Sequence, residues 1–316
     1  MKKKGKITML AFALSMTLAT NISVMAAQDV PIEEKTVTSG LDASDMYVMP
    51  GPDGQQCIGY LVTNYNSTAV NLGLNIEFRD AEYGNIGSAS SFVPSVEPGE
   101  TVFISVPNYY GETASYLYRS FSVAVASGTT AEPSGVSCSK MYTLIGPDGQ
   151  QCAGYVVTNE NSYDIFLGLT VDYLDDSNES IGTSSACIPC LGAGATACIY
   201  AVNYYGEEAT YANSSWAVSE SIYESVATSI QINLSAQDDH MRVSAVNISS
   251  GAVSLPEVTI LYFQESEPVY VYSGLLTDSN GSEGLGEGSG GFLNLDLPSS
   301  SWDTCYYYIT AYSSGS

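Results

Sequence analysis

One five-residue sequence carries the aromatic side chains best suited to binding a ligand. Asn-Tyr-Tyr-Gly-Glu stands at 108–112 and again at 203–207. Tyrosine beside asparagine and glycine is the composition of adaptable binding loops and of platforms on which sugars or peptides stack. We therefore expect a glycan or protein ligand to be bound by Tyr109, Tyr110, Tyr204 and Tyr205. The alternative is that each loop folds against the end of its own domain, with the hydroxyls bonded to backbone.

Cysteine is the second residue type that could do chemistry, and the chain has seven. Cys57 is the only cysteine before residue 138, and it is expected to be a buried free thiol. Cys187 and Cys198 stand 95 residues after Phe92 and Phe103, in a second copy of the same sequence pattern described below. Cysteine in place of a strand phenylalanine indicates a small buried hydrophobic residue. A disulfide among Cys152, Cys187, Cys190 and Cys198 stays open. A zinc cage is disfavoured, because only Cys187 and Cys190 have the spacing of a zinc knuckle.

The residues needed for catalysis are sparse. His240 is the single histidine, and no Gly-x-Ser-x-Gly sequence accompanies it. The loop from Asp278 begins like a calcium loop but has Glu283 where glycine is required. Acidic residues are plentiful, yet they fall in expected turns and on exposed strand faces rather than as a facing pair. We expect no catalytic residues, no cofactor and no metal site, and hence no enzyme.

The charge of the chain excludes two classes of partner. Lys and Arg number 9 against 34 Asp and Glu, a formal net charge of −25. A field of this sign repels nucleic acid phosphates and anionic lipid headgroups, both of which are bound through basic patches. Nucleic acid binding and membrane-surface binding are therefore not expected.

The N-terminus has the pattern of a secretory signal peptide. Lys2, Lys3, Lys4 and Lys6 precede an apolar run from Ile7 to about Ala19, and a small-residue exit follows. Residues 1–26 are the expected signal peptide and 27–42 a linker. The mature protein is expected to be secreted, without membrane insertion after cleavage.

An internal duplication organises the rest of the chain. Gly-Pro-Asp-Gly-Gln-Gln-Cys at 51–57 recurs letter for letter at 146–152, an offset of 146 − 51 = 95. The same ungapped offset aligns Leu-Gly-Leu at 72–74 with 167–169, and it aligns the two Asn-Tyr-Tyr-Gly-Glu sequences. The expected domains are 43–127 and its duplicate 138–222. A divergent third copy is expected at 229–316, where the sequence ending at Asn247 resembles the one ending at Asn64.

Apolar residues alternate with polar ones within each copy. Leu72, Leu74, Ile76 and Phe78 occupy every second position of one such run. This period indicates strands with one buried face, and turn residues separate the runs. No helical period appears after the signal sequence. The predicted fold is all-β: tandem Ig-like antiparallel β-sandwiches.

The order of these elements resembles the FxLYD-type immunoglobulin-like modules of exported bacterial proteins. The residues that carry the resemblance are Asn64, Leu74-Asn-Ile-Glu-Phe-Arg-Asp80, Ile86-Gly87 and Pro98-Gly-Glu100. The second copy has Asn159 and Leu169 to Asp175, but Gly192-Ala-Gly194 replaces Pro-Gly. The resemblance implies a binding or spacing domain in an exported protein and implies no catalytic activity.

These observations predict an exported, non-enzymatic binding or surface-interaction protein. A structural spacer or matrix protein is the first alternative, and a carbohydrate-active enzyme is a remote one.

Overall fold

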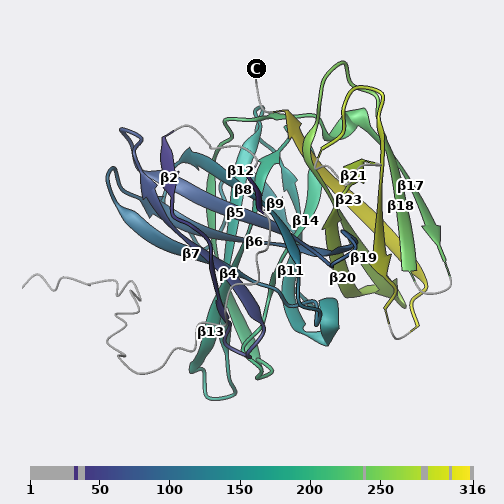
Figure 1. Ribbon diagram of the computed structural model, residues 1–316. Helices are drawn as coiled ribbons and strands as arrows, with labels where there is room; N and C mark the ends of the chain where they lie inside the picture. Colours follow the sequence, from purple (N-terminus) through teal and green to yellow (C-terminus); the bar gives the residue numbers. More distant parts are fainter. Residues whose placement is uncertain (1–31, 35–39, 238–239, 279–283, 299–300, 314–316) are drawn as a thin grey trace, which may run out of the picture.

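The computed structural model describes residues 32–34, 40–237, 240–278, 284–298 and 301–313 (Figure 1). Within these residues the regular structure consists of β-strands and two short 3-10 turns, Pro147–Gly149 and Ala227–Ser229. The prediction of an all-β chain with antiparallel sheets is confirmed. The expected signal peptide lies outside the described residues.

Residues 43–127 are called the first repeat, 138–222 the second repeat and 229–316 the third segment. The strands in or just before the first repeat are β1 (Ile32–Glu34), β2 (Leu41–Ala43), β3 (Tyr47–Pro50), β4 (Gln56–Asn64), β5 (Val70–Arg79), β6 (Asn85–Val96), β7 (Thr101–Pro107) and β8 (Tyr116–Val125). One sheet has the order β1-β8-β5-β6, and β2, β3 and β7 all join β4 in another.

The second repeat has the same arrangement. Its strands are β9 (Val136–Cys138), β10 (Tyr142–Ile145), β11 (Gln151–Asn159), β12 (Ile165–Leu174), β13 (Ser180–Leu191), β14 (Thr196–Val202) and β15 (Tyr211–Glu220). Cys57 pairs with Pro107 in the first repeat, and Cys152 pairs with Val202 in the second, so both partners move by the same 95 residues. The register predicted from the ungapped offset is therefore confirmed, because a one-residue slip would turn every core side chain to the opposite face.

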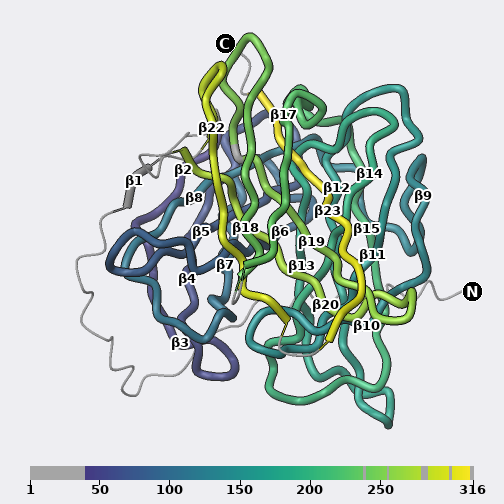
Figure 2. The backbone as a smooth tube through the Cα atoms, turned by 90° about the vertical axis from the view of Figure 1, so that its right-hand side faces the viewer, coloured from purple at the N-terminus to yellow at the C-terminus, as the bar shows by residue number. Residues whose placement is uncertain are grey.

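The third segment also contributes strands to two sheets. Its strands, with β16 just before it, are β16 (Glu224–Ser225), β17 (Ile230–Ala236), β18 (His240–Asn247), β19 (Ser254–Gln264), β20 (Glu267–Leu275), β21 (Thr277–Asp278), β22 (Gly290–Asp296) and β23 (Thr304–Ser313). The order β17-β18-β22-β21 forms one sheet. The order β20-β19-β23-β16 continues into the second repeat through a parallel bridge between Ile145 and Tyr270. The third segment thus packs against both repeats, with β20 beside β6 and β10 and β23 beside β13 and β14 (Figure 2).

A buried asparagine closes one end of all three segments in the same way. The side-chain amides of Asn64, Asn159 and Asn247 each donate to two or more backbone carbonyls, and their Oδ1 atoms accept the backbone N–H two residues on. All three side chains are fully buried. Buried polar groups need hydrogen-bond partners, and the asparagine amide supplies both the donor and the acceptor for these backbone groups. This explains asparagine at all three positions. The likeness between the sequences ending at Asn64 and Asn247 therefore has a structural basis.

The two repeats pack against each other through reciprocal contacts. Ser185 Oγ lies 3.0 Å from the backbone nitrogen of Phe92, and Ser90 Oγ lies 3.1 Å from that of Cys187. Ser90 and Ser185 are equivalent under the offset of 95, as are Phe92 and Cys187. The contact between β6 and β13 is therefore related to itself by an approximate two-fold axis, as in a symmetric dimer.

The glycine of each Leu-Gly-Leu sequence makes room for this contact. A Cβ on Gly168 would lie 2.7 Å from the ring of Phe92. A Cβ on Gly73 would lie 2.3 Å from Oγ of Ser122 in the same repeat and 2.9 Å from the Sγ atom of Cys187 in the other. Both glycines sit on the strand face opposite their own sandwich core, so any side chain there would push the repeats apart. The retained glycines thus serve the packing of one repeat on the other.

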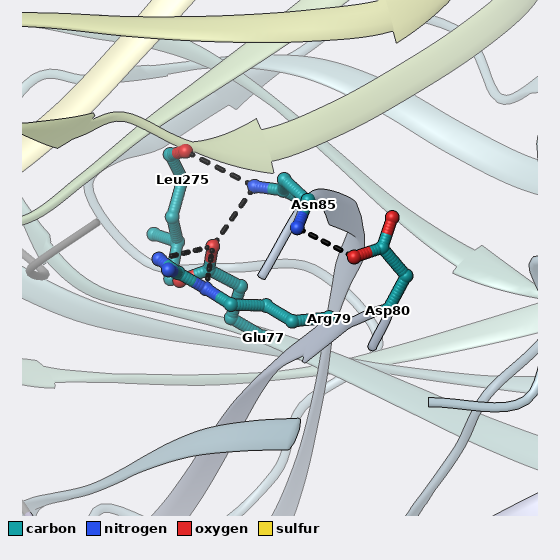
Figure 3. Close-up of polar contacts among 6 residues, drawn as sticks. Glu77, Arg79, Asp80, Asn85 and Leu275 are labelled. Atoms are coloured by element: carbon teal, nitrogen blue, oxygen red, sulfur yellow. Dashed lines mark hydrogen bonds and ion pairs between the residues drawn. The ribbon is translucent and has the colours of Figure 1, made fainter. Parts of the chain in front are cut away.

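A buried polar cluster lies where the first repeat meets the third segment. Glu77 and Arg79 form an ion pair of 2.9 Å with almost no exposed surface. Asn85 donates to Glu77 and, at 3.3 Å, to the carbonyl of Leu275 in β20 (Figure 3). The outer face of β5, which carries these polar residues, is therefore covered rather than solvated.

Candidate ligand-binding groove

Within each repeat, hydrogen bonds join the Gly-Pro-Asp-Gly-Gln-Gln-Cys sequence to the Asn-Tyr-Tyr-Gly-Glu loop. Gln56 Oε1 accepts hydrogen bonds from the side-chain amide of Asn108 and from the backbone of Ala114, at 3.0 and 2.9 Å. Gln151 and Asn203 repeat the same contact at 3.0 Å in the second repeat. The second glutamine of Gly-Pro-Asp-Gly-Gln-Gln-Cys and the asparagine of Asn-Tyr-Tyr-Gly-Glu are thus hydrogen-bonded partners within each repeat.

The second tyrosine of each loop is held against a glycine. The ring of Tyr110 lies on Gly87 and its hydroxyl donates to the carbonyl of Ser88, while Tyr205 lies on Gly182 and donates to the carbonyl of Thr183. A Cβ on Gly87 would lie 2.2 Å from the Tyr110 ring. This is the structural role that the sequence offered as the alternative to binding.

The rest of each loop meets the opposite repeat. Asp148 in the turn of the second repeat lies beside Gly111, where a Cβ would be 3.2 Å from its carboxylate. Asp53 in the turn of the first repeat lies beside Gly206, where a Cβ would be 3.1 Å from the Asp53 carboxylate. Both glycines have positive φ angles, which β-carbon-bearing residues rarely adopt. Each Gly-Pro-Asp-Gly turn therefore packs on the other repeat's Asn-Tyr-Tyr-Gly-Glu loop.

A groove of about 760 Å³ lies between these paired loops. It is within the size range of ligand sites in proteins. Its walls carry two tyrosines, several amide side chains and four carboxylates: Tyr109, Tyr204, Gln55, Gln150, Gln151, Asn108, Asn203, Asp53, Asp148, Glu207 and Glu208 line it. Asp53 and Asp148, Tyr109 and Tyr204, Asn108 and Asn203, and Gln55 and Gln150 are equivalent pairs under the offset of 95, whereas Glu207 and Glu208 come from the second repeat alone. The groove thus offers carboxylates and hydrogen-bonding groups to a ligand.

The four expected tyrosines take two positions relative to this groove. Tyr109 and Tyr204 line it, and Tyr109 is buried. Tyr110 and Tyr205 lie half-buried in their glycine contacts. Ligand binding by these rings stays a prediction. Gly-Pro-Asp-Gly around Asp53 and Asp148 is by itself typical of a tight turn. The signal in the sequence for a shared surface is the retention of both motifs in both repeats.

A second, smaller cavity of about 40 Å³ lies where all three segments meet. Glu257 of β19 faces it and accepts a hydrogen bond of 3.2 Å from Ser88 of β6. Desolvation raises the pKa of Glu257, and hydrogen bonds from Ser88 and Ser273 oppose part of the shift. Tyr110 and Cys187 also lie close enough to interact with this carboxyl group. The group is therefore held in its neutral form to a higher pH than a free glutamate.

Glu257→Gln should make stability less sensitive to pH. Below the ordinary glutamate pKa both folded and unfolded states are protonated, and the group costs nothing. As pH rises above that value the unfolded state ionises first, so wild-type stability falls until pH passes the folded pKa. Melting temperatures of both proteins between pH 4 and 8 should show the wild type losing stability relative to the variant. Parallel curves would contradict this account of Glu257.

All seven cysteines lie in the described residues and are free thiols, and Cys57 is buried as predicted. Desolvation raises the pKa of the Cys57 thiol, and burial raises those of Cys187 and Cys198 to about 12. Since the thiolate is the reactive form, these groups should react slowly.

Native labelling should therefore modify Cys138, the exposed cysteine, well before Cys57. Mass spectrometry of a time course with a maleimide reagent measures the order, and labelling in denaturant confirms that every site can react. Modification of Cys57 as fast as Cys138 would be inconsistent with the buried strand position.

No protein-family model matches the chain, and no curated protein matches it either. Along the described residues, no helix is long and apolar enough to span a bilayer. The same residues contain no group of three or more His, Cys, Asp or Glu side chains placed to hold a metal ion.

Proposed function

We propose that this is an exported, non-enzymatic binding protein built of three Ig-like β-sandwiches, with its ligand bound in the groove between the two repeats. The observation that carries the proposal is the reciprocal arrangement of the two repeated motifs around that groove. The secretory pattern of residues 1–26 and the resemblance to FxLYD-type modules support export and a binding role.

The chemistry of the walls favours a ligand with basic groups. Asp53, Asp148, Glu207 and Glu208 line the groove in a chain whose formal net charge is −25. Such a field attracts cations and accelerates their association. Amide side chains and backbone groups supply hydrogen bonds beside the carboxylates. An extended protein segment containing Lys or Arg fits this surface better than a neutral or acidic glycan.

A structural spacer or matrix protein is the second candidate. It is favoured by the packing of Tyr110 and Tyr205, whose rings and hydroxyls already have partners within their own repeats. If the motifs serve only to hold the repeats together, no ligand needs to enter the groove.

A binding measurement separates the two candidates. Arrays of Lys- and Arg-containing peptides, acidic peptides and glycans would first be screened, and the best binder measured by calorimetry. The double variant Asp53→Asn, Asp148→Asn should weaken binding of a basic peptide about tenfold or more, because two of the four carboxylates on the groove walls lose their charge.

The control variant is Glu132→Gln, Glu287→Gln, which removes the same charge from exposed positions outside the groove. It should bind as the wild type does. An equal loss in both variants would show a diffuse effect of net charge. Absence of any binder on the arrays would favour the spacer.

A further inference from the structure

The third segment covers one face of the second repeat. This face is the side of β10, β11 and β14 that points away from the repeat's own core. Tyr200 on it bonds to Ser273 of β20 at 2.8 Å, and Tyr142 and Cys198 lie close to Tyr308 of β23. Cys198 and Tyr200 are buried as a result.

The equivalent face of the first repeat is the outer side of β3, β4 and β7, and it is only partly covered. Cys57 at one end of it is buried, whereas Tyr47, Leu61 and Phe103 are 44%, 40% and 44% exposed. The offset of 95 places these residues at the positions of Tyr142, Val156 and Cys198. The rings of Tyr47 and Phe103 are in edge contact, with centroids 6.3 Å apart. They form one apolar patch, called here the open face.

The charges at the border of the two faces differ. Lys140 beside the covered face forms an ion pair of 3.1 Å with Glu267 of β20. Its equivalent beside the open face is Asp45, which is exposed. An occupant of the open face therefore needs a basic residue where the third segment has an acidic one.

The strand edges differ as well. Ile145 at the end of β10 forms the parallel bridge to Tyr270 of β20. The equivalent residue in β3 is Pro50, which has no N–H and protects a sheet edge from pairing. Figure 2 shows β20 beside β10, whereas β3 lies on the opposite side of the molecule. An occupant of the open face is thus expected to pack on the sheet and not to extend it.

We propose that the open face docks a β-sheet of a different protein, apolar at its centre and bearing Lys or Arg opposite Asp45. The third segment on the second repeat shows which kind of surface such a face accepts. A second copy of this chain is disfavoured. The third segment of another copy would bring Glu267 toward Asp45, and these two charges repel.

Site-specific crosslinking in cells that produce the protein identifies the occupant. Benzoylphenylalanine would replace Phe103 in the full chain, and the control would replace Phe292, a similarly exposed aromatic residue of the third segment. The proposal expects a heterologous protein crosslinked from position 103 and not from 292. A crosslinked second copy, or no product beyond the control, would overturn it.

The crosslinked protein is then purified and its affinity measured with the full chain. Asp45→Lys should weaken binding about fivefold or more, and Leu61→Ser should weaken it as well. Glu287→Lys reverses an exposed charge far from the open face in sequence and should leave affinity unchanged. Unchanged affinity in both open-face variants would overturn the proposal. Binding in the groove is tested with the Asp53 and Asp148 variants, and binding to the open face with the Asp45 and Leu61 variants. Either proposal can therefore fail without the other.

Discussion

Replacing Glu77 by alanine is expected to lower the free energy of unfolding by about 3–5 kcal/mol, because it leaves a buried guanidinium without its counter-charge. Glu77 and Arg79 have 0% and 1% exposed side-chain surface, and Arg79 Nε also donates to Glu77 at 3.0 Å. Arg79 stacks over the ring of Tyr118, so it cannot turn to solvent without losing that contact. The ion pair thus fixes the surface of β5 that the third segment covers.

Chemical denaturation of the single and double variants measures this effect. The double variant Glu77→Leu, Arg79→Met should recover much of the lost stability, since it removes both charges and keeps side-chain volume. The exposed pair between Lys140 and Glu267 provides the comparison, and its loss should cost about 1 kcal/mol or less. A small effect of Glu77→Ala would mean that this junction is solvated.

Replacing Asn159 by alanine should cost about 3 kcal/mol. Its amide donates to the carbonyls of Tyr163, Leu191 and Gly192 at 2.9 to 3.0 Å, and its Oδ1 accepts the backbone N–H of Asn161. Alanine would leave these buried groups unsatisfied, at roughly 1–3 kcal/mol for a buried polar group. The same substitution at Asn64 or Asn247 should have an effect of similar size.

Asn161→Ala is the matched control, because Asn161 lies in the same turn but is not buried. It should cost about 1 kcal/mol or less. Equal losses in the two variants would show that the turn, and not the buried amide, stabilises this end of the sandwich.

The sequence predicts the strands and their register because a period of two and an ungapped duplication leave little freedom. Leu72, Leu74, Ile76 and Phe78 all face the core, as alternation requires. The same pattern misses the burial of the opposite face. Asn71, Glu77 and Arg79 are polar and are nevertheless covered, since other parts of the chain pack on them. Periodicity reports one buried face and cannot report a second made of polar residues.

The packing of the segments on each other could not be predicted from one sequence. Glycines 73 and 168 are compatible with any strand, and only the structure shows Phe92 and Cys187 seated on them. The two repeated motifs can be recognised in the sequence. Their contact across the groove depends on the approximate two-fold relation between the repeats, which no local sequence pattern encodes. Tyrosine content predicted a binding loop, whereas the wall of the groove is built largely from Asp53, Asp148 and the amide side chains.

The groove exists only if the two repeats pack on each other, and small-angle X-ray scattering of the chain without residues 1–26 tests the packing of the segments most directly. For a compact chain of about 290 residues the expected radius of gyration is about 19 Å. Three sandwiches in a row, each built of strands about 34 Å long, would give a radius of gyration of about 30 Å. A value near 19 Å is the result we expect. A value near 30 Å would contradict the reciprocal packing of the repeats and with it the groove.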